Sequence, residues 1–481
     1  MQRARRIIAT LLGITGATLP FSTRASALAP PATNPPAPQP AASVPAPLPA
    51  PLIETDEMLQ PVAPAAHLVS SWDEALSGLR SRSTDLRIAL DEVERSDAQW
   101  RQTLAASLPN LTGSGNVTWN LLRSRPCATA GVCSSVLVPN ALTYGASVTL
   151  TQPVFAPRAW HAARTAKLAI QVTELSAEDE KRVLTIALAN AVVSVVTAER
   201  ISEINRVGLR AALDRLALAR RRVALGAGNV LDTVRADQDV SVARSAVVTG
   251  DESLRQARET LGLALGSTDP FGVVPDINLN GVEASARGSC ADAGTVDDRA
   301  DIVAARGSLE IASRNIDDAR LRFSPTVDLV STFGLVGTPG DLPVTYPSGL
   351  HEAWTIAGVL TVPFYEGGAR YGAIRENRAL ADESAQRLEA ARRAAKVQVT
   401  QARRAVDVAE QNRRVAEQAR DLARETERLS RIAFQAGTGT SLDLIESGRR
   451  LREAEIQLAL QEFGLVQARI AALLSMSRCR W

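Results

Sequence analysis

Two short stretches decide the fold of this 481-residue chain: Leu150-Thr151-Gln152-Pro153-Val154-Phe155 and Leu360-Thr361-Val362-Pro363-Phe364. They are versions of one segment, about 210 residues apart. Two more pairs recur in the same order at a similar offset, residues 108–111 with 323–327 and the glycine turns 226–232 with 437–443. Three matched pairs in one order indicate two copies of a single structural unit.

The segments around these stretches alternate between apolar and polar residues with a period of two. From Leu111 to Leu121 every second residue is apolar or glycine, and the residues between them are Thr, Ser or Asn. Residues 145–151 continue the alternation, and the second copy repeats it with Val327, Leu329, Phe333 and Leu335 and with Trp354, Ile356, Leu360 and Val362. Such alternation predicts strands with one apolar and one polar face. Segments of about 9–11 residues fit a strand that crosses a membrane, although a strand of a soluble sandwich has the same pattern.

The aromatic residues favour the membrane alternative. Only 4% of the chain is aromatic, yet eleven of its eighteen aromatics lie in or beside these four segments: Trp119, Tyr144, Phe155, Trp160, Phe323, Phe333, Tyr346, Trp354, Phe364, Tyr365 and Tyr371. Outer-membrane barrels carry aromatic girdles in this way, and the smallest have about eight strands. Because an open sheet edge is not viable in lipid, we expect two, three or four copies of the chain to pool their strands.

The remainder of each copy is expected to be helical, because no proline lies between Pro157 and Pro270 or after Pro363. Residues 158–225 would form a helix of about 100 Å, and residues 71–107 and 231–265 would form helices of about 50 Å each. The second copy opens with a shorter helix near 296–322. Heptad-like spacing occurs at Leu209, Leu213, Leu216 and Val223 and at Val415, Ala419, Leu422 and Leu429.

The N-terminus is typical of a secretory signal. Three arginines precede the apolar stretch 7–19, and Ala25-Ser26-Ala27 offers a cleavage site; a membrane anchor is the alternative. Removal of residues 1–27 takes away four arginines and no acids, which changes the net charge from +2 to about −2 and argues against a nucleic-acid binder. The predicted organisation is a signal peptide (1–27), a Pro/Ala-rich disordered linker (28–66), a first repeat (67–268), an equatorial linker (269–296), a second repeat (297–476) and a C-terminal tail (477–481).

No catalytic constellation is present in the sequence. His67, His161 and His351 lack metal-ligand spacing, and there is no GxSxG, P-loop or CxxC motif. We therefore predict neither an enzyme nor a cofactor or metal site. The four cysteines form two candidate disulfides in an exported chain, Cys127 with Cys133 and Cys290 with Cys479, and unpaired thiols are the alternative.

Together these features resemble the TolC family of outer-membrane channel-tunnels. The resemblance covers residues 72–475 and rests on the duplicated order of half helix, strand hairpin, long helix, glycine turn and half helix. Local matches include Pro363-Phe364-Tyr365-Glu366-Gly367-Gly368, Val223-Ala224-Leu225-Gly226 and Phe434-Gln435-Ala436-Gly437. The resemblance implies an α+β membrane protein in which long antiparallel coiled-coil helices build an α-barrel. Four strands from each of three copies would then close a twelve-stranded outer-membrane β-barrel.

The glycine turns are the candidate working parts. By the resemblance they form the periplasmic entrance and meet an adaptor protein, with Gly226, Ala227, Gly437 and Thr438 as the contact residues. The alternative is that a tight reversal between two helices requires glycine whatever it touches.

Acidic residues follow the second turn. Asp443 and Glu446 match positions where the family has inward-facing carboxylates, and in a trimer these would favour the entry of cations. Their alternative role is helix capping, since Thr440-x-x-Asp443 and Asn229-x-x-Asp232 both resemble capping boxes.

The resemblance is incomplete at the periplasmic aperture. The family's closed entrance adds a tyrosine and an arginine that bond to the aspartate of the first copy. Here Phe434 and Gly439 stand at those two positions, whereas the aspartate remains as Asp232. We therefore expect a weaker or different closed state.

The function that the resemblance implies is a passive exit duct of a tripartite export machine. The partners would be two further copies in a homotrimer, outer-membrane lipid, a periplasmic adaptor and an inner-membrane transporter, either ABC or proton-driven. No cysteine lies at the predicted cleavage site, so lipid attachment there is not expected. This favours type I protein secretion over small-molecule efflux, because many efflux members are lipidated. The alternative of another class is a periplasmic coiled-coil adaptor without a pore.

Overall fold

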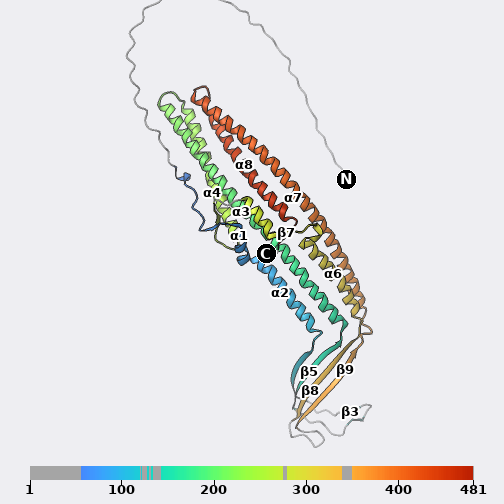
Figure 1. Ribbon diagram of the computed structural model, residues 1–481. Helices are drawn as coiled ribbons and strands as arrows, with labels where there is room; N and C mark the ends of the chain where they lie inside the picture. The colour runs from blue at the N-terminus through green and yellow to red at the C-terminus, as the bar shows by residue number, and fades with distance from the viewer. Residues whose placement is uncertain are drawn as a thin grey trace, which may run out of the picture. The chain divides into compact units, whose positions relative to one another are not determined.

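The computed structural model describes residues 56–119, 121, 127–128, 132–133, 142–274, 279–338, 349–479 and 481 (Figure 1). The helices are α1 (Trp72–Arg82), α2 (Thr84–Ala105), α3 (Pro157–Ala224), α4 (Val230–Ala264), α5 (Leu279–Ser289), α6 (Ala300–Leu321), α7 (Ala369–Gln435) and α8 (Ser441–Leu474), with 3₁₀ turns η1 (Glu57–Leu59) and η2 (Val296–Asp298). The strands are β1 (His67–Val69), β2 (Asn110–Trp119), β3 (Cys127–Ala128), β4 (Val132–Cys133), β5 (Leu142–Phe155), β6 (Phe271–Val273), β7 (Cys290–Asp292), β8 (Thr326–Thr338), β9 (Gly349–Thr361) and β10 (Ser477–Cys479).

Two long helices organise the helical part. Helix α3 has 68 residues and α7 has 67, so each is about 100 Å long. Near the strands, contacts between helices run in the order α2–α3–α6–α7, and toward the opposite end they run in the order α4–α3–α8–α7 (Figure 1). Two shorter helices therefore lie along each long helix, as the helix lengths predicted from the sequence indicate.

The first half helix differs from the prediction because it is broken at Ser83. This residue ends α1, where its N–H donates to the Leu79 carbonyl at 2.9 Å. Its hydroxyl also accepts a hydrogen bond from the Leu86 N–H at 3.3 Å and so caps α2. A serine that satisfies a free N–H in this way starts a new helix axis.

Residues 56–66, within the predicted linker, form an N-terminal strap on α3 and α4. Arg244 of α4 binds the Asp56 carboxylate at 2.9 Å, Arg206 of α3 donates to the Gln60 carbonyl at 3.1 Å, and Arg258 of α4 donates to the Ala63 carbonyl at 2.7 Å. The pKa of Asp56 is lowered mainly by the hydrogen bond from the Met58 N–H and to a smaller extent by Arg244. The strap thus ties both helices of the first hairpin to one extended segment.

The four long strands form one antiparallel sheet in the order β2–β5–β8–β9. In its register Gly113, Val148, Phe333 and Trp354 lie in one row across the sheet. Strands β2 and β9 are its two edges. Within the described residues, the outer edge of each of these strands has no strand beside it.

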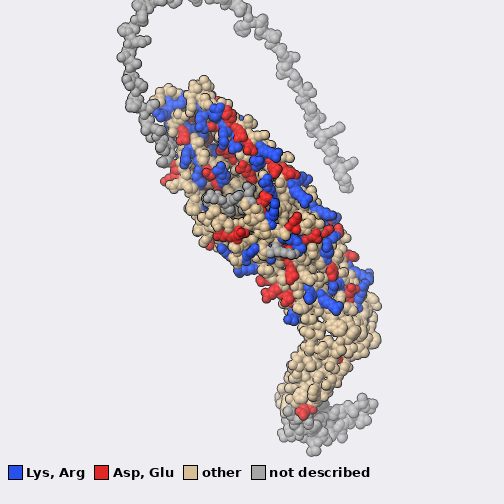
Figure 2. Space-filling view, in the orientation of Figure 1, with Lys and Arg blue, Asp and Glu red and all other residues tan. Residues whose placement is uncertain are grey.

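The two faces of this sheet differ as the alternation predicts. Along β5 the apolar positions are the more exposed ones, and Leu111, Trp354 and Ile356 are about two-thirds exposed or more. On the other face hydroxyls bond between strands, Ser114 with Ser147 at 2.9 Å and Thr149 with Thr332 at 3.2 Å. Figure 2 shows charged side chains over the helices and very few over the strands. The sheet is therefore apolar on one face and carries hydroxyl groups on the other.

The main core lies at mid-length, where α3 meets α1, α4 and α8. Leu188, Val192, Val193 and Val195 of α3 are almost fully buried there. This stretch also makes α3 the helix, among the described residues, that is long and apolar enough to cross a membrane by composition alone. Its burial assigns it to the core of the helical part instead.

The two heptad stripes have different environments. Leu209, Leu213 and Leu216 are buried against α4. On α7, by contrast, Val415 and Leu422 are about two-thirds exposed, and Val408 and Leu429 extend that stripe in both directions. Within the described residues, the α7 stripe therefore has no partner in the same chain.

A disulfide joins Cys290 of β7 to Cys479 of β10, across 189 residues of sequence. The strands around it are antiparallel, and beyond them the Trp481 indole donates to the Thr185 hydroxyl of α3 at 3.2 Å. The predicted C-terminal tail is thus held near the middle of the helical part. The backbone register also places Cys127 opposite Cys133, but these side chains lie outside the described part of the chain.

We predict that Cys290→Ser with Cys479→Ser frees the last residues and lowers the free energy of unfolding by about 2–4 kcal/mol, because the loop closed in the unfolded chain is long. Amide exchange of residues 477–481 and denaturant unfolding measure the two effects. Cys127→Ser with Cys133→Ser is the control for removal of two cysteines. Unchanged exchange at 477–481 would show that the tail is held without the disulfide.

Candidate functional site

The two glycine turns lie side by side at the end of the helices that is far from the sheet (Figure 1). Gly226 and Gly437 have φ of 70° and 79°, a left-handed conformation that glycine adopts without strain. After them the Ala227 N–H returns to the Arg222 carbonyl at 2.9 Å, and the Thr438 N–H returns to the Ala433 carbonyl at 3.0 Å. This is the Schellman end of a helix. The turn itself therefore accounts for both glycines.

The predicted contact surface at these turns is exposed. Gly226, Ala227, Gly437 and Thr438 are all solvent-accessible, and a side chain at either glycine would meet no neighbouring atom within 4 Å. The structure leaves this surface free, so contact with an adaptor stays a prediction.

Two contacts tie the first turn to the second. The Ser441 hydroxyl at the start of α8 donates to the Asp232 carboxylate in the first turn of α4. The Arg222 guanidinium lies 4.4 Å from the centre of the Phe434 ring and donates to the Phe434 carbonyl at 3.3 Å. Asp232 and Phe434 are both predicted aperture residues. Each thus contacts a residue of the other turn in the same chain, Asp232 through Ser441 and Phe434 through Arg222. We call these two contacts the tip ties.

Asp443 completes a capping box with Thr440. Its carboxylate accepts from the Thr440 hydroxyl at 2.6 Å, and its N–H donates to that hydroxyl at 3.1 Å. The expected counterpart in the first copy does not form: the side-chain amide oxygen Oδ1 of Asn229 accepts from the Leu231 N–H at 3.0 Å and so caps α4 alone. The Asp232 carboxylate instead accepts from the Ser441 hydroxyl and lies 3.9 Å from Arg235.

Glu446 is bound by two arginines of its own helix. Arg449 lies 2.9 Å and Arg450 3.0 Å from its carboxylate oxygens. These hydrogen bonds, to Arg449 first, lower the pKa of Glu446. The carboxylate stays ionised to lower pH than a free glutamate, but two cations stand beside it. A ring of Glu446 side chains would therefore carry less net negative charge than acids alone.

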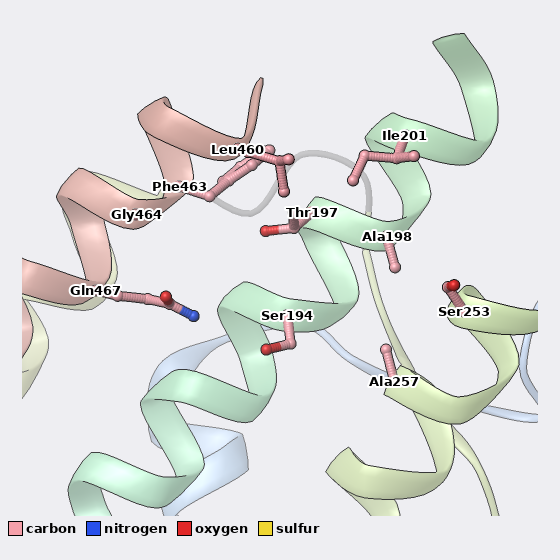
Figure 3. A pocket seen from close by; sticks show the side chains of 10 residues that line it. All are labelled: Ser194, Thr197, Ala198, Ile201, Ser253, Ala257, Leu460, Phe463, Gly464 and Gln467. Carbon is pink, nitrogen blue, oxygen red and sulfur yellow. The ribbon is translucent and has the colours of Figure 1, made fainter. Parts of the chain in front are cut away.

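The described residues contain no group of three or more His, Cys, Asp or Glu side chains that could hold a metal ion. His67 stacks on Phe271 at 5.1 Å, and the His161 ring bonds to the Arg314 carbonyl at 2.9 Å; the His351 side chain is outside the described part. A groove of about 370 Å³ lies between α3, α4 and α8 (Figure 3). Ser194, Phe463 and Gln467 are among its lining residues, and none of the ten is titratable. Neither feature offers catalytic chemistry.

The sequence model of the outer membrane efflux protein family matches residues 75–267 and 295–475. The chain belongs to this family. The two matched ranges correspond to the two predicted repeats, and the family places the chain in the outer membrane, with its helices in the periplasm. It is a family of transport channels.

Named relatives are similar over part of their length. The fusaric acid resistance protein FusA of Burkholderia cepacia is 27% identical over 154 residues, 31% of this chain and 28% of the relative. The cation efflux system protein CusC of Escherichia coli K12 is 24% identical over 290 residues, 59% of each. The outer membrane protein OprJ of Pseudomonas aeruginosa is 25% identical over 384 residues, 78% of this chain and 77% of the relative. The chain therefore spans less than two thirds of the first two.

Solved structures share the fold. A CusC structure has a TM-score of 0.71 at 19% identity and covers 86% of this chain and 96% of its own. The outer membrane protein VceC of Vibrio cholerae has a TM-score of 0.69 at 16% identity, with 84% and 95% covered. At these identities the likeness shows the fold alone.

Sequence reasoning missed one half of each tip tie, Ser441 and Arg222. Both lie within a few residues of positions that we predicted. No sequence signal pairs them with Asp232 and Phe434, because the partners are more than 200 residues apart.

We predict that Ser441→Ala raises the fraction of time that channels of the purified protein are open in planar bilayers. The substitution removes a hydrogen bond to a charged group, worth about 1.5–3 kcal/mol, so the closed arrangement should lose about tenfold or more in population. Ser241→Ala is the control, because the Ser241 hydroxyl bonds only to the Asp237 carbonyl of its own helix, at 3.1 Å. Equal open fractions in the two variants would contradict a role for this tie.

Proposed function

We propose that this protein is the outer-membrane exit duct of a tripartite export machine. Three copies would form the duct, and an adaptor and an inner-membrane transporter would couple it to energy. The observation that carries the proposal is the sheet. Its four strands have one apolar and one polar face, its two edges have no strand beside them within the described residues, and it lies at the end of helices of about 100 Å. A pore-free coiled-coil adaptor would not need such a sheet.

The apolar stripe of α7 supports assembly with further copies. Val408, Val415, Leu422 and Leu429 recur every seven residues and are about half exposed or more, which is the pattern of a coiled-coil seam that lacks its partner helix. Helix α4, at the other edge of the helix layer, also exposes apolar residues, among them Val234 and Val248. We propose that α7 of one copy packs against α4 of the next.

The exposed turns are the surface that we propose for the adaptor. Gly226 and Gly437 present backbone without side chains, which allows a partner helix to approach closely. Ala227 and Thr438 flank them with small side chains.

Two cargo classes remain for the duct. The relatives FusA and CusC are named for fusaric acid resistance and cation efflux, and these names favour small solutes as cargo. The absence of a cysteine at the predicted cleavage site favours protein export by a type I route. Deletion of the gene distinguishes them: sensitivity to small toxic compounds with unchanged secreted proteins supports efflux, and loss of a secreted protein supports type I secretion.

We predict that Val415→Glu with Leu422→Glu abolishes the trimer in outer-membrane extracts, because desolvating two carboxylates in an apolar seam costs several kcal/mol. Arg414→Glu is the control, since it changes a charge on the same helix outside the stripe. Crosslinking followed by gel electrophoresis measures the assembly. Trimers that persist in the double variant would contradict the proposed α7 contact, and a protein that conducts no ions in bilayers would contradict the duct itself.

We propose that Asp443 and Glu446 line the periplasmic aperture. Asp443→Ala with Glu446→Ala is expected to lower the preference for cations and to weaken block by trivalent cations. The effect should be modest, because Arg449 and Arg450 already offset Glu446. Reversal potentials in a salt gradient measure it, with Glu252→Ala on α4 as the control. Unchanged selectivity and block would remove both acids from the aperture.

A further inference from the structure

Helices α2 and α7 are the two edges of the helix layer near the sheet. Contacts there run in the order α2–α3–α6–α7, so within the described residues each of these two helices has one packed side and one open side. Helix α2 leads into β2 and β9 leads into α7, and β2 and β9 are the edges of the sheet. Pairing of β9 in one copy with β2 in the next would therefore bring α7 of the first copy beside α2 of the second.

The buried residues of the two helices show which of their residues face away from the chain. Leu86 and Ser96 are the buried residues of α2, and Asp91 stands five residues from each of them. Five residues turn an α-helix by about 140°, so Asp91 points away from α3. On α7, Glu383 stands five residues before Leu388, which is buried against α6. Glu383 therefore points away from α6 in the same way.

Residues of α2 and α7 that lie at one level can be found through α3. Asp85 of α2 and Glu180 of α3 line one groove and repel each other, and Glu92 and Thr173 line the same groove. Because α2 runs toward the sheet and α3 runs away from it, Asp91 lies level with residue 174 of α3. Helices α3 and α7 begin at residues 157 and 369 and end at residues 224 and 435. This offset places the level of Asp91 at about residues 385–386 of α7.

Two charge pairs of opposite order meet at this level. On α2, Asp91 is followed four residues later by Arg95, and on α7, Glu383 is followed four residues later by Arg387. All four residues are exposed. A rotation about an axis along the helices leaves each residue at its level, and the two helices are antiparallel. Asp91 of one copy therefore faces Arg387 of the next and Arg95 faces Glu383, each within about 3 Å of its level. We call these four residues the charge square.

The charge square has weak competing partners inside one chain. Arg387 binds Glu383 of its own helix at 2.5 Å, and Arg95 binds Glu92. Exposed pairs of this kind contribute little stability, and each member can bind a second charge. Within the described residues Asp91 has no ion pair. Four alternating charges on two helices would form a network, which stabilises more than an isolated exposed pair does.

The charges beside the charge square agree with this register in part. Arg87 of α2 lies level with Glu389 of α7, which is a pair of opposite charges. Glu94 and Asp382 also lie level, and their like charges oppose the contact. A slip of α7 by one helical turn in either direction would be worse, because it places like charges of the square opposite each other. The square therefore favours one register over its nearest alternatives.

We propose that the charge square joins neighbouring copies of this chain: Asp91 and Arg95 of one copy bind Arg387 and Glu383 of the next and so fix the register between their helices. The inference rests on the proposed assembly of three copies, and it concerns a contact nearer the sheet than that of α7 with α4. Register matters at this place because α2 and α7 adjoin the edge strands. A slip of one residue between two strands turns every side chain to the other face of the sheet.

The test exchanges the charges on one helix at a time. Asp91→Arg with Arg95→Asp exchanges those of α2, and Glu383→Arg with Arg387→Glu exchanges those of α7. Neither exchange alters the net charge, but each alone places like charges opposite each other at every contact between copies. We expect either exchange alone to lower the temperature at which purified trimers dissociate by a few degrees, and both together to restore most of the loss. Heating in mild detergent at low salt, followed by gel electrophoresis, measures the trimer fraction.

Two comparisons separate the charge square from other effects. Glu310→Arg with Arg314→Glu is the matched control, because these residues form a pair at 3.2 Å, four residues apart, on α6 within the helix layer. This control should match the wild type. At 1 M salt, where the Debye length is about 3 Å, the differences among the variants should nearly vanish.

Each outcome decides one question. Single exchanges that are as stable as the wild type, a combined variant that is no more stable than either exchange alone, or a control that loses as much stability as they do overturns the charge square. Wild-type trimers that conduct no ions overturn the proposed duct and leave the comparison of trimers valid. Wild-type protein that forms no trimer overturns both proposals.

Discussion

Unpaired backbone groups at the two edges of the sheet are the constraint on which the rest of the structure depends. In hydrocarbon each N–H or C=O without a partner costs several kcal/mol, and β2 and β9 present two such rows. A single chain cannot satisfy them, so the sheet requires neighbouring strands from other copies. The same neighbours would cover the apolar stripe of α7, which is exposed in one chain. The unpaired strand edges and the exposed stripe of α7 therefore both call for further copies of the chain.

The internal repeat determines how the helices are arranged behind the sheet. Each long helix runs the full length of the helical part, and shorter helices fill the space beside it at both ends. The two repeats are not equivalent at the tips. Asp232 of the first repeat accepts a bond from the second, whereas Asp443 of the second caps its own helix. The two repeats thus share one framework, but the corresponding aspartates Asp232 and Asp443 have different roles.

Much of the fold could be predicted from the sequence because periodic patterns and proline positions are local signals. Strand alternation, the long helices and the glycine turns all follow from residues close together in the chain. The break at Ser83 was missed because a capping serine inside a helical pattern has no distinctive spacing. The strap at residues 56–66 was missed because its composition continues that of the Pro/Ala-rich segment, while its arginine partners lie some 150–190 residues away.

The candidate site was less accessible to sequence reasoning. Turn residues and acids could be named from position, but their partners could not. Whether Glu446 acts as a free acid depends on Arg449 and Arg450, whose rotamers the sequence does not specify.

The bond between Cys290 and Cys479 has a consequence for the order of assembly. It encloses α6, α7, α8 and both strands of the second repeat in a covalent ring. The ring can close only when residue 479 has reached an oxidising compartment, after everything between the two cysteines has been exported. A formed disulfide therefore shows that the entire second repeat has been exported. A chain truncated before Cys479 cannot form this disulfide.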